Sequence, residues 1–213
     1  MAAQRQRMEP GQSSMARTQA AVTRERPVRA GRSPLRALLV GGDRRSIARS
    51  NEALALLRAD RARVGELVRL VHDDDWLVAM RAVDLMEKLA HERPDWVQPH
   101  RGLFIGPLAQ HPSWEIRLQI ARALPLLRWT PAQRERVVAV LLGYARQPRK
   151  FVKAWALDSL ARFAEHDGSL MAVVESLIQE FERSESPALV ARAGQIRKRS
   201  RALSAGCEAA VHG

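Results

Sequence analysis

The chain has 213 residues, 35 Lys and Arg against 23 Asp and Glu, a formal net charge of +12, and 46% hydrophobic residues. The hydrophobic fraction excludes a globally disordered chain. The single cysteine excludes a disulfide framework and is typical of a reducing compartment, so we expect a cytoplasmic protein. No apolar run reaches the roughly 20 residues of a membrane-spanning helix, and we expect no membrane association.

Residues 1–32 are rich in Arg, Gln and Ser and contain no apolar segment of the kind found in a secretory signal. Such a composition does not offset the entropy of ordering the backbone, so we expect a disordered basic tail. A mitochondrial transit peptide is the alternative, against which Glu9 and Glu25 argue. We expect a repeat domain over residues 33–203 and a flexible tail over residues 204–213.

From residue 33 onward, apolar residues recur at three- and four-residue spacing, and no alternating β pattern competes. This spacing predicts an all-α protein in which two kinds of helix alternate. The Thr130-Pro131 and Ser186-Pro187 pairs predict helix starts with a capping side chain, and Asp73–Asp75 suits a helix N-terminus better than a cation site. The expected first helices span 34–40, 61–71, 98–110, 130–146 and 169–183, and the second helices 44–58, 76–91, 113–128, 149–165 and 187–203.

The second helices are copies of one another. Their apolar anchors are separated by 38, 36 and 37 residues, and a fainter copy begins at Ile47. Another apolar residue follows each anchor one helical turn later, on the same face. A fixed period of this length indicates stacked helical repeats. The anchors are Val78, Ile116, Val152 and Leu189.

The paired helices, the turn His111–Trp114, and the apolar-basic pairs Ile116-Arg117 and Val152-Lys153 resemble HEAT repeats over residues 34–203. The resemblance implies a right-handed α-solenoid of about five antiparallel helix pairs, whose second helices line a concave face that holds another macromolecule. Ala79 departs from the pattern, because Arg is usual there. The spacing from Ile47 to Val78 is shorter than the others, and Arg197 stands where an apolar core residue is expected. Such departures are common in terminal repeats.

The positive charge is concentrated in the second helices. They carry net charges of +3, 0, +2, +2 and +5, whereas the five first helices together carry +3. Under the HEAT resemblance, the concave face therefore attracts polyanions. The leading interpretation is a non-catalytic scaffold for an acidic protein partner, and the alternative is nucleic-acid binding.

Basic and aromatic residues beside the apolar stripe are the candidate partner-binding residues. Trp155, between Lys153 and Arg162 in sequence, is either a binding hot spot or a packing residue between helices. For Arg117 and Lys153 the alternative, which the HEAT resemblance implies, is bonding to turn carboxylates between repeats. The candidates are Arg81, Arg117, Arg122, Lys153, Trp155, Arg162 and Arg192.

Three second helices begin with an aromatic residue at matching positions, which favours packing between repeats. These residues are Trp76, Trp114 and Phe151.

No helix carries two histidines at metal-binding spacing, and no Gly-rich phosphate loop or catalytic triad is present, so we expect no metal, cofactor or catalysis. Some HEAT-like proteins are DNA glycosylases or bilin lyases. Asp158, three residues after Trp155, is the one candidate for a glycosylase carboxylate.

Overall fold

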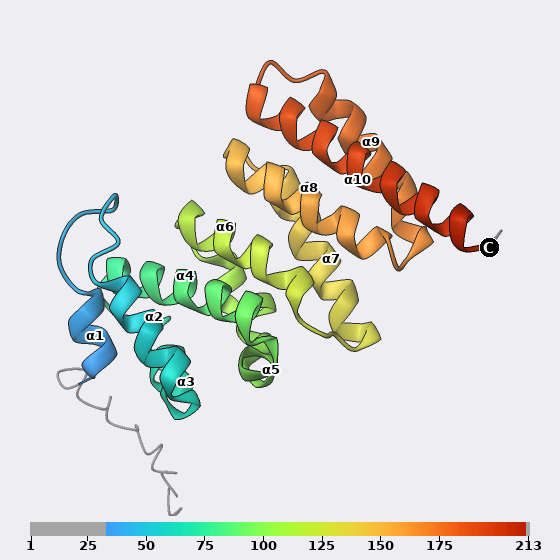
Figure 1. Ribbon diagram of the computed structural model, residues 1–213. Helices are drawn as coiled ribbons and strands as arrows, with labels where there is room; N and C mark the ends of the chain where they lie inside the picture. Colours follow the sequence, from blue (N-terminus) through green and yellow to red (C-terminus); the bar gives the residue numbers. More distant parts are fainter. Residues whose placement is uncertain (1–32, 212–213) are drawn as a thin grey trace, which may run out of the picture.

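The computed structural model describes residues 33–211, with side chains for residues 33–203. The predicted basic tail, residues 1–32, lies outside the described residues. Between residues 33 and 211 the chain forms helices and turns without a strand. The helices follow one another in chain order from α1 at one end of the molecule to α10 at the other (Figure 1).

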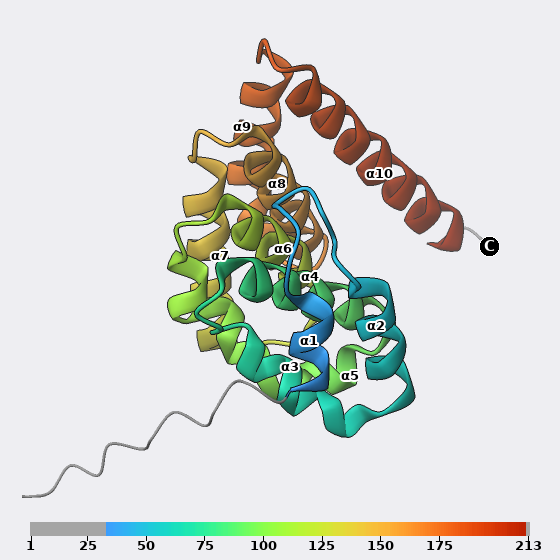
Figure 2. The same cartoon turned by 90° about the vertical axis from the view of Figure 1, so that its left-hand side faces the viewer.

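Two rows of helices make up the molecule, as the alternating pattern predicts. Figure 2 shows α7 and α9 on one side and α2 and α10 on the other. In the second row, α4 packs on α6, α6 on α8 and α8 on α10. This row consists of α2 (Ser50–Ala59), α4 (Trp76–Glu92), α6 (Trp114–Ala123), α8 (Lys150–Ala164) and α10 (Pro187–Val211).

The first row is less regular, because prolines and glycines interrupt it. The expected helix over 98–110 is instead a run of 3-10 turns, η3 (Gln98–Ile105) and η4 (Pro107–Gln110), which follows the short α5. Pro99, Gly102 and Pro107 do not favour a continuous α-helix there. The row consists of α1 (Pro34–Leu39), η2 (Arg61–Arg63) with α3 (Val64–Leu70), α5 (Pro94–Val97), α7 (Pro131–Ala145), and η6 (Gly168–Leu170) with α9 (Met171–Glu182).

Side chains fix several helix starts. Thr130 and Gln133 form a reciprocal capping box at α7, with Pro131 at its first position, as predicted. Asp75 caps α4 by accepting a hydrogen bond from the backbone N–H of Leu77 at 3.0 Å. α10 begins at Pro187, as predicted, but the expected side-chain cap is absent, because the hydroxyl of Ser186 has no hydrogen-bond partner.

Some helix ends differ from the prediction. α6 ends at Ala123 and continues only as η5 (Leu124–Leu126), because Pro125 prevents a continuous α-helix. α10 continues past residue 203 to Val211. No helix in the described part of the chain is long and apolar enough to cross a membrane.

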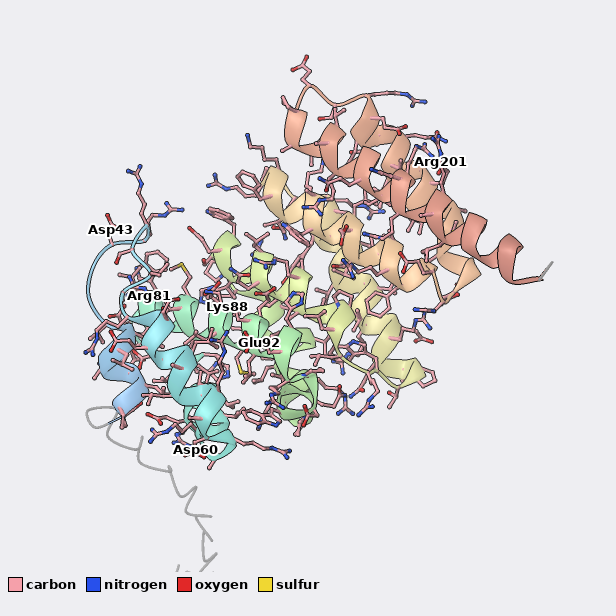
Figure 3. The ribbon with its side chains drawn as sticks, in the orientation of Figure 1. Asp43, Asp60, Arg81, Lys88, Glu92 and Arg201 are labelled. Atoms are coloured by element: carbon pink, nitrogen blue, oxygen red, sulfur yellow. The ribbon has the colours of Figure 1, made fainter. Side chains whose placement is uncertain are left out.

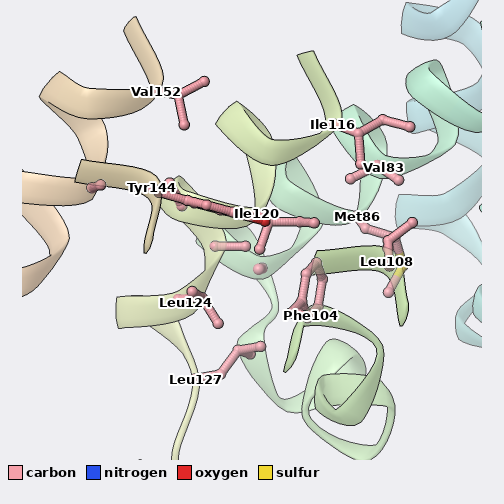
Figure 4. Close-up of a cluster of buried hydrophobic side chains, with 14 of the residues drawn as sticks. Val83, Met86, Phe104, Leu108, Ile116, Ile120, Leu124, Leu127, Tyr144 and Val152 are labelled. Carbon is pink, nitrogen blue, oxygen red and sulfur yellow. The ribbon is translucent and has the colours of Figure 1, made fainter. Parts of the chain in front are cut away.

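The core lies between the two rows and follows the repeat. Three anchors, Val78, Ile116 and Val152, are fully buried, and Leu189 is almost so. Figure 4 shows how Ile116 and Ile120 of α6 meet side chains from the first row. The hydroxyl of Tyr144 donates a hydrogen bond of 2.7 Å to the carbonyl of Ala109, which joins α7 to the preceding repeat.

The first repeat departs from the pattern. Its second helix was expected to begin at residue 44, but α2 begins at Ser50 and residues 41–49 form a loop. Gly41 and Gly42 have φ values of +84° and +70°, a conformation that a helix does not contain. The carboxylate of Asp43 accepts hydrogen bonds from the backbone N–H groups of Arg45 and Ser46, which favours a turn over a helix here.

Candidate functional site

Trp155 lies on the exposed side of the second row, between guanidinium groups from both neighbouring helices. The Cζ atom of Arg122, on α6, is 5.0 Å from the indole centroid, and that of Arg192, on α10, is 4.1 Å away. The neighbouring cations are therefore not Lys153 and Arg162, as the sequence order indicated. The ring packs partly against the core and remains partly exposed. It can therefore both join repeats and contact a partner.

Asp158 follows Trp155 on α8 and is 1% exposed. Its carboxylate pairs with Arg162 at 3.0 Å, Arg192 at 3.4 Å and Arg199 at 3.0 Å. Burial opposes ionisation, but the hydrogen bonds donated by Arg162 and Arg199 outweigh it and hold the pKa of Asp158 below its ordinary value. A carboxylate enclosed by three guanidinium groups is not available to a bound base, so the structure gives the glycosylase alternative no support.

Glu87, on α4, is a second buried carboxylate, and its side chain is almost fully enclosed. Its Oε1 atom lies 2.9 Å from Nη2 of Arg122 and 3.0 Å from Nε2 of His91, but neither carboxylate oxygen accepts a well-aligned hydrogen bond. Burial raises the pKa of Glu87, because lost hydration outweighs the attraction of Arg122 and His91. The protein thus holds two buried carboxylates whose pKa values are shifted in opposite directions.

Polar contacts join α4, α6, α8 and α10 in one continuous row. Gln119 of α6 donates a hydrogen bond of 2.9 Å to Asp84 of α4, next to the contact between Arg122 and Glu87. We call this row the polar ladder: Asp84, Glu87, Gln119, Arg122, Trp155, Asp158, Arg192 and Arg199. Because neighbouring helices hold each member, the partly exposed members form an ordered surface, whereas Glu87 and Asp158 are buried.

The prediction that Arg81 reaches a partner is wrong. Its side chain is 2% exposed, because the loop over residues 41–49 folds across this part of α4. The guanidinium donates hydrogen bonds of 2.5 to 3.1 Å to backbone carbonyls only, and it thereby holds the loop in place. The acceptors are the carbonyl oxygens of Leu39, Gly41, Asp43 and Ser46. Figure 3 locates Arg81 beside this loop and Asp43 within it.

Arg117 and Lys153 bind groups within the protein. Arg117 donates a 2.6 Å hydrogen bond to the carbonyl of His111 and a 2.7 Å hydrogen bond to the side chain of Gln147. It therefore joins two successive turns, although neither acceptor is a carboxylate as expected. Lys153 lies 3.4 Å from a carboxylate oxygen of Glu180, on α9 rather than in a turn.

Packing between repeats accounts for only part of the surface of the aromatic residues that begin the second helices. Trp114 stacks on Phe151, with ring centroids 6.4 Å apart, which confirms inter-repeat packing for this pair. However, Phe151 is 49% exposed and Trp76 is 45% exposed. The amine of Lys150 lies 5.5 Å from the Phe151 centroid. The row of helix starts therefore also presents accessible aromatic surface.

A pocket of about 200 Å³ opens where the 41–49 loop meets α4 and α6. Its apolar wall consists of Ile47, Met80, Trp114 and Leu118. We call it the loop pocket. Figure 3 shows Lys88, which also lines it, on α4. This pocket could not be predicted from the sequence, because it depends on a loop at residues for which the apolar spacing predicts a helix.

Five members of the polar ladder were not among the predicted partner-binding residues: Asp84, Glu87, Gln119, Asp158 and Arg199. The four-residue spacing of Asp158 and Arg162 signals a pair on one helix. Arg199 lies 41 residues from Asp158, and no local pattern reports that contact. Among residues 33–203, no group of three or more His, Cys, Asp or Glu side chains is arranged to hold a metal ion.

The sequence matches no protein-family model and no curated protein. The structure resembles solved helical repeat proteins. A crystal structure of an engineered protein superposes with a TM-score of 0.53 at 19% identity, covering 76% of this chain and 77% of the other. Computationally designed armadillo repeat proteins for modular peptide recognition give 0.50 at 16% identity, covering 75% and 69%. A further designed armadillo repeat protein gives 0.52 at 17% identity, covering 76% and 79%. The chain thus has the fold of an armadillo- or HEAT-like α-solenoid.

Proposed function

We propose that the protein is a non-catalytic scaffold that holds a segment of a protein partner along the polar ladder. The observation that carries this proposal is the partly exposed indole of Trp155 on α8, held between Arg122 and Arg192 of the two neighbouring helices. Tryptophan and arginine contribute disproportionately to binding energy at interfaces. Because neighbouring helices already fix these side chains, a partner meets an ordered surface, and the entropy cost of binding is reduced.

Charge favours an acidic partner. Around Trp155, four arginines face three carboxylates, and one of these carboxylates, Glu87, has a raised pKa. The arginines are Arg122, Arg162, Arg192 and Arg199, and the carboxylates are Glu87, Asp158 and Glu165. The side chain of Arg162 is 46% exposed, so it can bind a partner carboxylate without leaving Asp158.

The similar fold of armadillo repeat proteins designed for modular peptide recognition supports the choice of a peptide segment as the bound element. We expect such a segment to lie across successive helices and to contact several repeats. The polar ladder offers this geometry across α4, α6, α8 and α10. A phosphate backbone would satisfy the same arginines, so the experiment includes a nucleic-acid arm.

The test is a pull-down with the tagged full chain, with and without nuclease, read by mass spectrometry. We expect proteins that remain bound after nuclease treatment and are lost with Trp155→Ala. Trp96→Ala is the matched control, because Trp96 is also partly exposed and lies under an arginine, with Arg93 Cζ 5.3 Å from its centroid, but belongs to α5 in the first row. Circular dichroism checks that both variants fold.

Two results would contradict the proposal. Capture that disappears with nuclease assigns the face to nucleic acid, and fluorescence anisotropy with duplex DNA at about 50 and 200 mM salt then shows the steep salt dependence of phosphate contacts. Capture that survives Trp155→Ala but not Trp96→Ala places binding on the first row instead.

A further inference from the structure

The loop pocket lies at the α4 end of the polar ladder and shares Asp84 and Gln119 with it. Its volume of about 200 Å³ is below the roughly 300–1,000 Å³ of sites that enclose drug-sized ligands. The pocket therefore suits a single large side chain rather than a whole small molecule. Its apolar wall, formed by Ile47, Met80, Trp114 and Leu118, sets the chemistry of that side chain.

The loop pocket is held open by interactions within the protein. Arg81 fixes the loop through hydrogen bonds to its carbonyl groups, and Arg44 in the loop pairs with Glu115 at the start of α6. Ile47, which is 53% exposed, is therefore held beside α4 rather than buried in the core. A side chain that enters the pocket replaces water without first ordering the loop, which lowers the cost of binding.

The charged groups that line the loop pocket leave it positive. Four are cations and two are carboxylates, and Arg44 and Lys88 pair with the carboxylates of Glu115 and Asp84. Arg81 binds carbonyl groups only, so its charge has no carboxylate partner. The side chain of Arg45 is exposed and has no ion-pair or hydrogen-bond partner among the described residues. The pocket therefore combines an apolar wall with two cations whose charge no carboxylate neutralises.

We propose that the loop pocket receives one large apolar side chain of the partner segment, and that acidic residues beside that side chain bind the exposed Arg45, next to the positive charge of the buried Arg81. This inference rests on the proposed function and names the chemistry of the bound segment: an acidic peptide with one apolar anchor. The chain's own N-terminal segment does not fit this description, because residues 1–36 carry a net charge of +6. Like charges disfavour its entry into a positive pocket.

The pocket also indicates the path of the segment. Trp114 forms part of the pocket wall and stacks on Phe151 of the next repeat. Trp155 follows Phe151 by one helical turn on the same face of α8. A segment anchored in the pocket therefore crosses Phe151 and reaches the indole between Arg122 and Arg192, so that the pocket and the ladder bind one continuous peptide.

The experiment begins with selection of a displayed library of random twelve-residue peptides on the immobilised full chain. We expect enriched peptides to carry Asp or Glu on both sides of one Leu, Met, Phe or Trp. A synthetic copy of one such peptide is then titrated against the full-length variants. Arg45→Glu and Ile47→Glu each place a carboxylate at the pocket rim, and each is expected to weaken binding at least about tenfold. Neither side chain is buried, so both variants are expected to fold.

Arg136→Glu is the matched control, because the side chain of Arg136 is also exposed and without a partner among the described residues but belongs to α7 in the first row. Occupancy is read directly by methyl NMR of the protein labelled at its methionine methyl groups. Met80 lines the loop pocket, whereas Met171 lies on α9 and is 52% exposed. The peptide is expected to shift the Met80 signal and leave that of Met171 in place.

The outcomes separate this inference from the proposed function. Peptides that need Trp155 but bind Arg45→Glu normally and leave the Met80 signal unmoved overturn the loop pocket and keep the scaffold. Enrichment of basic peptides overturns the assigned chemistry. If no peptide is enriched, or if the enriched peptides ignore both Trp155→Ala and the pocket variants, the scaffold proposal fails, and the pocket inference fails with it.

Discussion

The guanidinium of Arg192 lies over the indole of Trp155, with Cζ 4.1 Å from the ring centroid, and the same side chain reaches Asp158 at 3.4 Å. One arginine of the last repeat thus contacts both the exposed aromatic surface of α8 and its buried carboxylate. A partner carboxylate that binds Arg192 competes with Asp158. Binding and stability are therefore coupled on this face.

Asp158→Asn is expected to destabilise the protein by about 3 kcal/mol near pH 7, because it leaves three arginines without their shared carboxylate. The pKa of Asp158 is lowered in the folded state, whereas in the unfolded chain it is about 3.9. Its contribution is therefore complete above about pH 5 and is lost as the pH falls through the folded-state pKa. Urea unfolding from pH 3 to 7 measures this. Equal curves for the variant and the wild type at pH 7 would refute the ion-pair centre.

Glu87→Gln is expected to have the opposite effect. Burial raises the pKa of Glu87 in the folded state, so its charged form opposes folding. The two proteins should be similar below about pH 4, and the variant should gain up to about 1 kcal/mol as the pH rises to 8. The control is Glu92→Gln, whose exposed carboxylate pairs with Arg58 and has a lowered pKa. A loss of stability in Glu87→Gln at pH 8 as large as that in Asp158→Asn would contradict this.

Arg81→Met tests whether Arg81 stabilises the fold. The methionine keeps most of the aliphatic stem but removes every hydrogen bond to the loop carbonyls, and we expect a loss of about 3 kcal/mol. Arg45→Met, at an exposed position in the same loop, should change stability by less than about 0.5 kcal/mol. Chemical denaturation compares the two. Similar small effects would show that the loop does not depend on Arg81.

Tyr144 is the single tyrosine of the chain, so absorbance near 295 nm reports its ionisation alone. Burial raises its pKa far above the ordinary value, and its hydroxyl donates to the carbonyl of Ala109. The folded protein should therefore show no tyrosinate step near pH 10, where the guanidinium-denatured chain titrates. A reversible step near pH 10 in the folded protein would place this hydroxyl in water.

The second row could be predicted from sequence because its signal is local and repeated. Val78, Ile116 and Val152 recur at nearly constant spacing and are all buried. The first repeat could not be predicted in the same way. Gly41 and Gly42 adopt positive φ values, and a buried arginine from the next repeat then fixes the loop, so the decisive contact is far away in sequence.

The candidate site was predicted in part. Trp155, Arg122 and Arg192 do meet, but the sequence order pointed to Lys153 and Arg162 as the neighbours of the indole. On stacked helices, a side chain meets residues of the adjacent repeats more closely than those beside it in the chain. The net charges of the second helices also did not identify the arginines that are available to a partner, because a net charge does not reveal which cations already bind a buried carboxylate.

Asp158 has a consequence for how α8 and α10 open. Two of its three arginine partners, Arg192 and Arg199, come from α10. In a stacked repeat protein each unit is stabilised mainly by its neighbours, and units open locally and cooperatively. If α10 detached, the buried carboxylate would lose most of the positive charge around it, so α8 would become unstable at the same moment. Hydrogen exchange should therefore show α8 and α10 opening together as one cooperative unit.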